Sequence, residues 1–206
     1  MVLVVGAGGH ARVCLEALSD TGHPVVGCVS ADGVGVAGLS SPMVGHDRDL
    51  LAVATGLAVR HVFVAVGDNR AREAATARCR ADGLTLVNAI SRYAMVSPSA
   101  VLGDGVVILA GAVVNAAAVV GDGAILNTRC SVDHDVQVGA FAHVSVGVSL
   151  AGGVLVGARA LLGVGSCVLP NIRIGDDAIV GAGAVVVRDV ADGATVVGVP
   201  ARPLQR

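Results

Sequence analysis

Residues 120–150 read VGDGAILNTRCSVDHDVQVGAFAHVSVGVSL, and every sixth residue of this stretch is valine or leucine. The same period extends in both directions, so that sixteen consecutive anchor positions carry valine, leucine or isoleucine. These anchors are Val96, Leu102, Ile108, Val114, Val120, Leu126, Val132, Val138, Val144, Leu150, Val156, Leu162, Val168, Ile174, Val180 and Val186. A period of six fits neither an α-helix nor a simple strand. It predicts a prism of short strands, in which each coil has three six-residue faces and sends one large side chain per face to the axis.

A second layer of the repeat supports this prism. Small or β-branched side chains usually stand four residues after an anchor, as at Ala112 and Cys130. Glycine recurs directly after an anchor, as at Gly121 and Gly139, where we expect sharp corners that need a backbone free of Cβ strain. Eighteen residues per coil predict about five coils, stacked at the strand spacing of roughly 4.8 Å.

The composition excludes several function classes. The net charge is −2, and all fourteen basic residues are arginine, so there is no electrostatic case for binding nucleic acid or a membrane surface. Aromatic residues are almost absent, which removes stacking platforms for bases. Five scattered cysteines form no CxxC pair, and we expect reduced, buried thiols in a cytoplasmic protein.

The high hydropathy raises the question of a membrane span. The segment 138–158 has no formal charge and is long enough to cross a bilayer, but it carries five glycines, a histidine and the six-residue period. We therefore expect no membrane span. The N-terminus runs directly into Val2–Val5 without a basic region or cleavage site, so no signal peptide is expected.

Residues 1–90 have a different pattern, in which apolar strands alternate with helices. The expected strands are 2–5, 25–29, 62–66 and 85–87, and the expected helices are 11–18, 47–54 and 70–81. This alternation predicts a parallel sheet, about half of a dinucleotide-binding fold. The sequence therefore predicts an α/β, Rossmann-like half domain over 1–90 and an all-β prism over 91–206, joined by a hinge at 90–98.

A glycine-rich turn follows the first expected strand. Gly6-Ala7-Gly8-Gly9-His10-Ala11 fits a loose G-x-G-x-x-A pattern at a strand-to-helix turn, where backbone N–H groups attract phosphate. Because a second mononucleotide half is missing, a single nucleotide diphosphate fits this turn better than NAD. The turn alone is equally consistent with a packing role, and His10 with a simple helix-start residue.

Polar residues are scarce in the prism, so the cluster Asp133-His134-Asp135 stands out. His134 lies two residues after the anchor Val132, so its side chain should project outward. An imidazole beside carboxylates is suited to general-base work near neutral pH. The alternative from spacing alone is an ordinary solvated turn.

Taken together, these motifs resemble a known family. The chain is similar to the bacterial nucleotide-sugar acetyltransferases of the left-handed β-helix (hexapeptide-repeat) superfamily, close to the N-acetyltransferases of UDP-4-amino-sugars and GDP-perosamine and to the sialic acid O-acetyltransferases. The likeness rests on the following residues: Gly6-Ala7-Gly8-Gly9-His10, Asn127-Thr128, His134-Asp135, His143-Val144-Ser145-Val146-Gly147, Ala151-Gly152, Cys167-Val168-Leu169-Pro170-Asn171 and Gly198-Val199-Pro200-Ala201.

The resemblance implies that the β-helix is left-handed and that the protein is a homotrimer. It also implies acetyl-CoA as the co-substrate, no metal, and an acceptor that is a nucleotide-linked amino-sugar in bacterial glycan biosynthesis. It implies that His134 is the catalytic base and Asp135 the carboxylate that tunes it. His143, Gly152, Val164 and Ala182 would line the acetyl-CoA site. The acceptor would lie near Gly8, Gly9, His10 and Gly67. Relatives often carry glutamate where this chain has Asp135, and acids after the second strand where it has Ser30-Ala31.

We expect the acceptor amine to attack the thioester directly while His134 removes its proton. Three other functions are alternatives to N-acetylation. O-acetylation of a sialic acid would use the same fold with a hydroxyl acceptor. A zinc hydratase of the γ-carbonic anhydrase type needs three histidine ligands, whereas the prism has only His134 and His143. A non-catalytic assembly module would leave the histidine–acid pair unexplained.

Overall fold

The computed structural model describes residues 1–204. The chain divides into two compact units, Met1–Arg92 and Tyr93–Arg206. None of the helices within residues 1–204 is both long and apolar enough to cross a bilayer. All five cysteines are free; four are buried, but Cys167 is exposed, so the expectation of buried thiols is wrong at that position.

The first unit is a parallel five-stranded sheet in the order β3-β2-β1-β4-β5. Its strands are β1 (Val2–Val5), β2 (Val25–Ser30), β3 (Met43–His46), β4 (His61–Val64) and β5 (Thr85–Leu86), and a further short strand, β6 (Ala89–Ile90), follows. The helices are α1 (Gly9–Asp20), α2 (Leu50–Gly56), preceded by the 3₁₀ turn η1 (Asp47–Asp49), and α3 (Asn69–Ala81).

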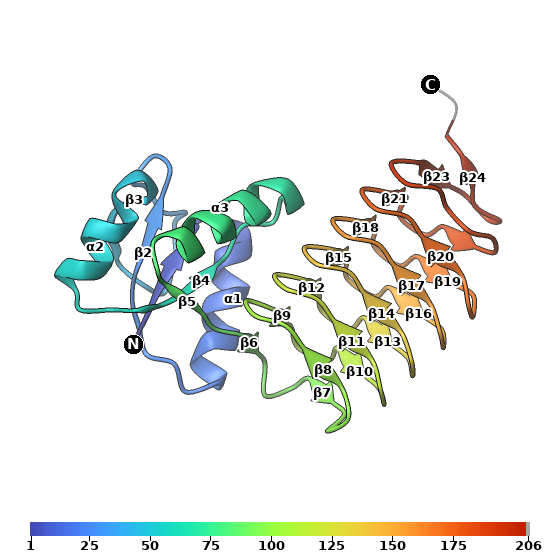
Figure 1. The fold of residues 1–206 in the computed structure, drawn as a ribbon, viewed down its shortest axis with the longest axis horizontal. Helices are drawn as coiled ribbons and strands as arrows, with labels where there is room; N and C mark the ends of the chain where they lie inside the picture. Colours follow the sequence, from blue (N-terminus) through green and yellow to red (C-terminus); the bar gives the residue numbers. More distant parts are fainter. Residues whose placement is uncertain (205–206) are drawn as a thin grey trace. The chain divides into compact units, whose positions relative to one another are not determined.

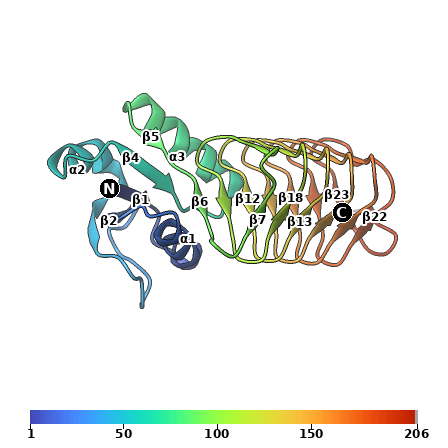
Figure 2. The same cartoon turned by 90° about the horizontal axis from the view of Figure 1, so that it is seen from below.

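Helices cover both faces of this sheet. Figure 2 shows α1 on one side of β1 and both α2 and α3 on the other. This arrangement follows from right-handed crossovers, because the chain first adds β2 and β3 on one side of β1 in the sheet and then β4 and β5 on the other. The core beneath α2 and α3 contains Leu3, Val62, Leu50 and Cys79, all at most 1% exposed. The order reverses at β1, and ligands of open parallel sheets bind outside the carboxyl ends of the strands at such a reversal, here β1 and β4.

The sequence predictions for this unit hold in type and approximate position, but they omit β3 and the two-residue β6. Met43–His46 forms β3, which pairs in parallel with β2. Its sequence, MVGH, has no alternating apolar run and carries a glycine, so it gave no strand signal. The predicted 47–54 helix is divided between η1 and α2.

The second unit is a three-sided column of stacked coils (Figure 1). Face 1 consists of β9 (Val107–Ile108), β12 (Ile125–Leu126), β15 (His143–Val144), β18 (Leu161–Leu162), β21 (Ile179–Val180), β23 (Thr195–Val197) and the antiparallel β24 (Arg202–Pro203). Face 2 consists of β7 (Met95–Val96), β10 (Val113–Val114), β13 (Ser131–Val132), β16 (Ser149–Leu150), β19 (Cys167–Val168) and β22 (Val185–Val186). Face 3 consists of β8 (Val101–Leu102), β11 (Val119–Val120), β14 (Gln137–Val138), β17 (Leu155–Val156) and β20 (Arg173–Ile174).

The coils repeat in strict register. Val114 pairs with Val132, and Val132 pairs with Leu150 on the next coil. Every predicted anchor from Ile108 to Val186 is at most 4% exposed, whereas Val96 and Leu102, in the first coil, are half-buried. The prediction of one large axial side chain per face is therefore confirmed, and it explains why only the corners and outer strand positions are available for chemistry.

The expected reason for the glycines after the anchors is wrong. Gly121 and Gly139 have ordinary φ angles, but a Cβ on either would lie 2.6 Å from a backbone nitrogen of the next coil. These glycines allow close stacking. The left-handed backbone occurs instead three residues after an anchor, at glycines and also at Arg129, Asp135 and Phe141. Asp135 therefore occupies the strained position of its corner.

Candidate active site

Three corners join the faces, and we name each by the faces it joins. Residues 133–136, between β13 and β14, form one turn of the 2–3 corner, and residues 127–130 and 145–148 form turns of the 1–2 corner. Because an anchor points inward, the residue two positions later stands at the tip of the corner. This geometry places His134 on the outside of the 2–3 corner, with 62% of its side chain exposed.

The imidazole of His134 is oriented by Asp135. Nδ1 of His134 lies 2.8 Å from Oδ2 of Asp135. Because a carboxylate only accepts hydrogen bonds, Nδ1 carries the proton and Nε2 keeps its lone pair in the neutral ring. The aspartate side chain is therefore long enough to reach the imidazole. This hydrogen bond, together with the charge of Asp133, raises the pKa of His134 above its usual value.

Asp133 is the second carboxylate at this corner, and two donors fix it. Its Oδ1 accepts from the backbone N of His134 at 2.8 Å and from Nδ2 of Asn115 at 3.1 Å. Asn115 stands on the previous coil, eighteen residues earlier. The sequence analysis missed Asn115, although the eighteen-residue repeat would have placed it directly beside Asp133.

His143 and its neighbours lie elsewhere on the column. His143 projects from face 1, and Nδ2 of Asn127 lies 3.1 Å from its Nε2. Val164 and Ala182 stand at the tips of successive 1–2 corners, and both are exposed. The 2–3 corner is the one corner that does not border face 1. A single prism therefore brings together His134, Asp135 and Gly152, but not His134 and His143.

A shallow groove runs along face 2 beside the His134 corner. Its volume is about 430 Å³, and its lining includes Asn115, Ser131, Asp133, Ser149 and Cys167. The remaining lining is apolar and consists of Leu150, Ala151, Val168 and Leu169. The groove therefore reaches the 2–3 corner at Asp133, the residue before His134, and none of its described lining residues is cationic.

In the first unit, the glycine turn lies at the carboxyl end of β1, where the strand order reverses. Gly6 needs its missing side chain, since its φ is +113° and a Cβ would lie 2.6 Å from the carbonyl oxygen of Ala65. Gly8 and Gly9, in contrast, face open space, with no heavy atom within 4 Å of an added Cβ. Their backbone at the start of α1 is therefore accessible to a ligand, as phosphate binding at a helix N-terminus requires.

His10 lies behind this turn and is not a charged group. Its Nε2 is 3.4 Å from Sγ of Cys14, and burial, together with the positive charge of Arg72, lowers the pKa of His10 to about 4. At neutral pH it is a neutral imidazole, suited to hydrogen bonding and unsuited to neutralising phosphate. Burial also raises the pKa of the Cys14 thiol, which makes a nucleophilic role for Cys14 unfavourable.

Arg72 is a functional candidate that the sequence analysis missed. It is 2% exposed, and its Nη1 donates to the carbonyl oxygens of Val66 at 3.1 Å and Gly67 at 2.9 Å. Its Nη2 donates to Oδ1 of Asn69 at 2.8 Å. Arg72 thereby fixes the loop after β4, on which Gly67 also faces open space. The signal was present in the spacing of Arg72, Thr76 and Cys79 along the buried face of α3.

The loop after β2 lies at the same carboxyl edge of the sheet. The carboxylate of Asp32 accepts from Oγ of Ser30 at 2.9 Å and from the backbone N of Val34 at 3.0 Å, and these bonds lower its pKa. Val36 N donates to the carbonyl oxygen of Ala7 at 3.0 Å. Asp32, which directly follows Ser30-Ala31, therefore shapes the loop.

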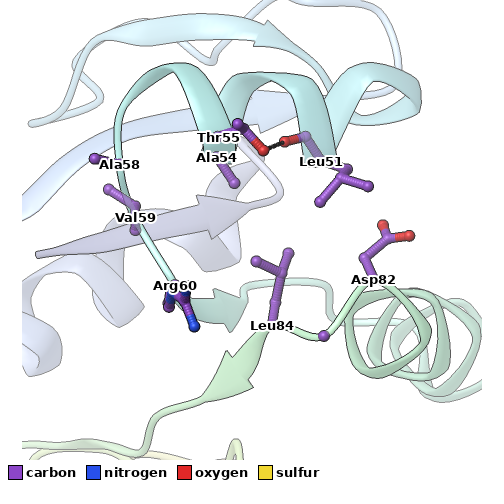
Figure 3. Close-up of a pocket in the computed structure, with 9 residues that line it drawn as sticks. Leu51, Ala54, Thr55, Ala58, Val59, Arg60, Asp82 and Leu84 are labelled. Carbon is purple, nitrogen blue, oxygen red and sulfur yellow. Dashed lines mark hydrogen bonds between the residues drawn. The ribbon is translucent and has the colours of Figure 1, made fainter.

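A separate pocket of about 480 Å³ lies near the amino ends of β4 and β5 (Figure 3). Its lining includes Leu51, Thr55, Arg60, Asp82 and Leu84. Ligands of open parallel sheets bind at the carboxyl ends of the strands. This pocket is therefore distinct from the edge that carries Gly8 and Gly67.

Within residues 1–204, no group of three or more His, Cys, Asp or Glu side chains is arranged to hold a metal ion. Among the arginines of the prism, Arg159 is engaged by Asp177 through two 3.0 Å hydrogen bonds. Arg188 stands exposed at the tip of the 2–3 corner, at the position that His134 occupies three coils earlier.

Comparisons with known proteins agree with this arrangement. The family model of the PglD N-terminal domain matches residues 1–79. None of the curated proteins compared with the chain matches it significantly. Among solved structures, PerB from Caulobacter crescentus, crystallised with CoA and GDP-perosamine, is 46% identical, with a TM-score of 0.94 over 99% of this chain and 97% of that one.

The acetyltransferase domain of PglB from Neisseria gonorrhoeae, solved in complex with acetyl coenzyme A, is 38% identical, with a TM-score of 0.92 over 98% of both chains. A variant of the Caulobacter enzyme, in which one histidine is replaced by alanine, is described as a GDP-perosamine N-acetyltransferase and has a TM-score of 0.96. These similarities confirm the predicted fold, a Rossmann-like unit followed by a left-handed β-helix. The chain belongs to the family of nucleotide-sugar N-acetyltransferases.

Proposed function

We propose that this protein transfers the acetyl group of acetyl-CoA to the amino group of a nucleotide-linked amino-sugar, with His134 as the general base. The observation that carries the proposal is the pairing of His134 with Asp135 at 2.8 Å on an exposed corner. At a solvated turn, this pairing does not stabilise the fold of the prism. For a base that must accept a proton, however, the neighbouring carboxylate stabilises the imidazolium that forms.

Because Nδ1 of His134 carries the proton, Nε2 is the nitrogen that acts as the base. Nε2 of His134 removes a proton from the acceptor amine as the amine nitrogen attacks the thioester carbonyl carbon. The C–S bond of the tetrahedral intermediate then breaks, and CoA leaves as a thiolate that takes up a proton. Asp135 stabilises the imidazolium that forms in between. General-base assistance of this kind is worth about 10² to 10⁴-fold in rate.

The acetyl-CoA site requires more than one copy of the chain. His143, Val164 and Ala182 belong to face 1 and the 1–2 corner, whereas His134 and Gly152 belong to the 2–3 corner. A homotrimer would bring face 1 of one prism against the 2–3 corner of its neighbour, so that each seam holds one complete set. The apolar exposed positions on face 3, including Val119 and Leu155, supply further surface for such contacts.

The acceptor's nucleotide is assigned to the Rossmann-like domain expected over residues 1–90, and acetyl-CoA to the prism expected over residues 91–206. Gly8, Gly9 and Gly67 present open backbone at the switch point of the sheet, and neutral His10 lies beside them. Diphosphate groups suit this edge. Because the Caulobacter relative was crystallised with GDP-perosamine, a nucleoside-diphosphate 4-amino-sugar is the first acceptor to test. Such a reaction would serve glycan biosynthesis in the cytoplasm.

The test is a panel of acceptors with acetyl-CoA, followed by thiol release and by the mass of the product. We expect turnover with GDP-perosamine or a UDP-4-amino-4,6-dideoxy sugar and a product that carries one added acetyl group on nitrogen. A preference for a sialic acid, with acetylation on oxygen, would replace the amine acceptor by a hydroxyl. Absence of CoA release with every acceptor would refute the proposal.

A further inference from the structure

The imidazole of His134 lies directly against the backbone of Gly152, its counterpart on the next coil of the same corner. A Cβ built on Gly152 would be 2.6 Å from Cε1, 2.6 Å from Nε2 and 3.2 Å from Nδ1 of His134. Contacts below 3.0 Å essentially do not occur for real Cβ atoms. A side chain at position 152 and the observed ring position therefore exclude each other.

The backbones cannot separate to relieve this contact. Gly153 N donates to the carbonyl oxygen of His134 at 3.0 Å, and Asp133 N donates to that of Leu150 at 3.1 Å. These bonds belong to the ladder that stacks the whole column. The part that would move is the imidazole, which is the far end of a flexible side chain, and moving it would break its 2.8 Å contact with Asp135.

The backbone conformation gives no separate reason for glycine at position 152. Gly153 has a left-handed φ of +69°, whereas the φ of Gly152 lies outside the left-handed range. Alanine at position 152 would therefore be compatible with the chain path. Within this pair of glycines, only the second has a left-handed backbone, and the first faces the imidazole of His134.

We propose that Gly152 is a positioning residue for the reaction: its missing side chain leaves the space in which the His134 ring can bond Asp135 while keeping Nε2 uncovered. This inference rests on the proposed role of His134 as the base. It differs from a role for Gly152 in lining the acetyl-CoA site, because it acts on the base and not on the affinity for the thioester.

The test is Gly152→Ala, with Gly193→Ala as a control for the effect of backbone strain alone. Gly193 has a φ of +67° and no heavy atom within 4 Å of an added Cβ. The control thus carries the strain of a left-handed alanine without touching His134. We expect it to lose thermal stability while its kcat and the pKa of His134 stay as in the wild type.

For Gly152→Ala we expect a folded protein whose kcat falls about 10- to 100-fold, since a displacement of about 1 Å can cost 10²-fold in rate. The KM for acetyl-CoA should stay within about twofold of the wild-type value. In an NMR titration, the pKa of His134 should drop towards that of an isolated imidazole, because its contact with Asp135 is lost.

An unchanged His134 titration together with an unchanged kcat would overturn the inference. So would a raised KM for acetyl-CoA at constant kcat, which is the result of a direct contact with the thioester. The titration does not depend on turnover. A lowered pKa in a protein that transfers no acetyl group would therefore reject the proposed function and leave the seating of His134 on Gly152 supported.

Discussion

The carboxylate of Asp135 reaches the imidazole of His134 from a left-handed backbone position: the φ of Asp135 is 59°, and its Oδ2 lies 2.8 Å from Nδ1 of His134. The other left-handed corner positions of the column carry glycine or side chains such as Arg129 and Phe141. The fold therefore provides this left-handed conformation at successive corners from Gly105 to Gly183, and at the corner of Asp135 it directs an acid onto a base.

Asp135→Asn should shift the pH dependence of the reaction. The pKa of His134 is raised first by the hydrogen bond to Asp135 and then by the charge of Asp133. Since the base must be neutral, activity is lost as the pH falls through this raised value, and removal of the Asp135 charge moves the acid limb of kcat/KM to lower pH. The pH-independent value of kcat/KM should also fall at least about tenfold, because the imidazolium loses the Asp135 carboxylate that stabilises it. A pH–rate profile with an unmoved acid limb would contradict this role of Asp135.

His10 should make the folded state less stable at low pH. Its pKa is lowered from 6.5 to about 4, so the unfolded chain binds the proton more readily. The contribution of neutral His10 to the free energy of unfolding is fully present above pH 6.5 and is lost as the pH falls towards 4. Wild type should therefore lose about 2 kcal/mol more between pH 7.5 and pH 5 than His10→Gln does. Urea unfolding at fixed protein concentration measures this difference, and identical losses in the two proteins would argue against a buried neutral His10.

Two alanine substitutions in the glycine turn should differ in how much stability they cost. Gly6→Ala forces a Cβ to within 2.6 Å of the Ala65 carbonyl oxygen at a φ of +113°, and should cost about 2 to 4 kcal/mol of stability. Gly8→Ala meets open space and should cost about 1 kcal/mol or less, as the cap of α1.

Kinetics then separates packing from binding in this turn. If the nucleotide approaches the backbone at Gly8, Gly8→Ala should raise the KM for the nucleotide sugar at least about tenfold and leave the KM for acetyl-CoA unchanged. An unaltered KM for the nucleotide sugar would mean that the turn serves packing alone.

Mixed oligomers should report whether His134 and His143 act across a seam between copies. His134→Ala and His143→Ala subunits should each be nearly inactive alone. Refolded together in equal amounts, about a quarter of the sites in a cyclic trimer would receive His134 from one intact donor and His143 from the other. Recovery to about that fraction of wild-type activity is expected. Mixtures as inactive as the separate variants would indicate that the two histidines do not share a site.

The prism was predictable from the sequence because its period is enforced at every coil by burial. One axial side chain per face is a requirement that Ile108, Val132 and Leu162 all meet, so sixteen repetitions specify the strands, the faces and the corners. The same arithmetic places His134 at a corner tip and His143 on an outer face. The contact between Asp135 and His134 required the structure, because it depends on a left-handed φ that the aspartate itself does not signal.

The first unit was less predictable, since its signals are local and interrupted. β3 lacks an apolar run, and its strand conformation depends on pairing with β2. Arg72 illustrates the same limit in the site: arginine is usually exposed, yet this one is buried and donates to the carbonyl oxygens of Val66 and Gly67. Gly152 was placed in the site by family resemblance, but its contact with the His134 ring is visible only in three dimensions.

The most direct test of the central claim is the rate of acetyl transfer by His134→Asn to the best nucleotide amino-sugar acceptor, measured alongside the dissociation constant for acetyl-CoA. Loss of the base should lower kcat by more than about a hundredfold while acetyl-CoA binds as tightly as before. A variant that turns over at the wild-type rate would show that the proton leaves by another route and that His134 is not the base.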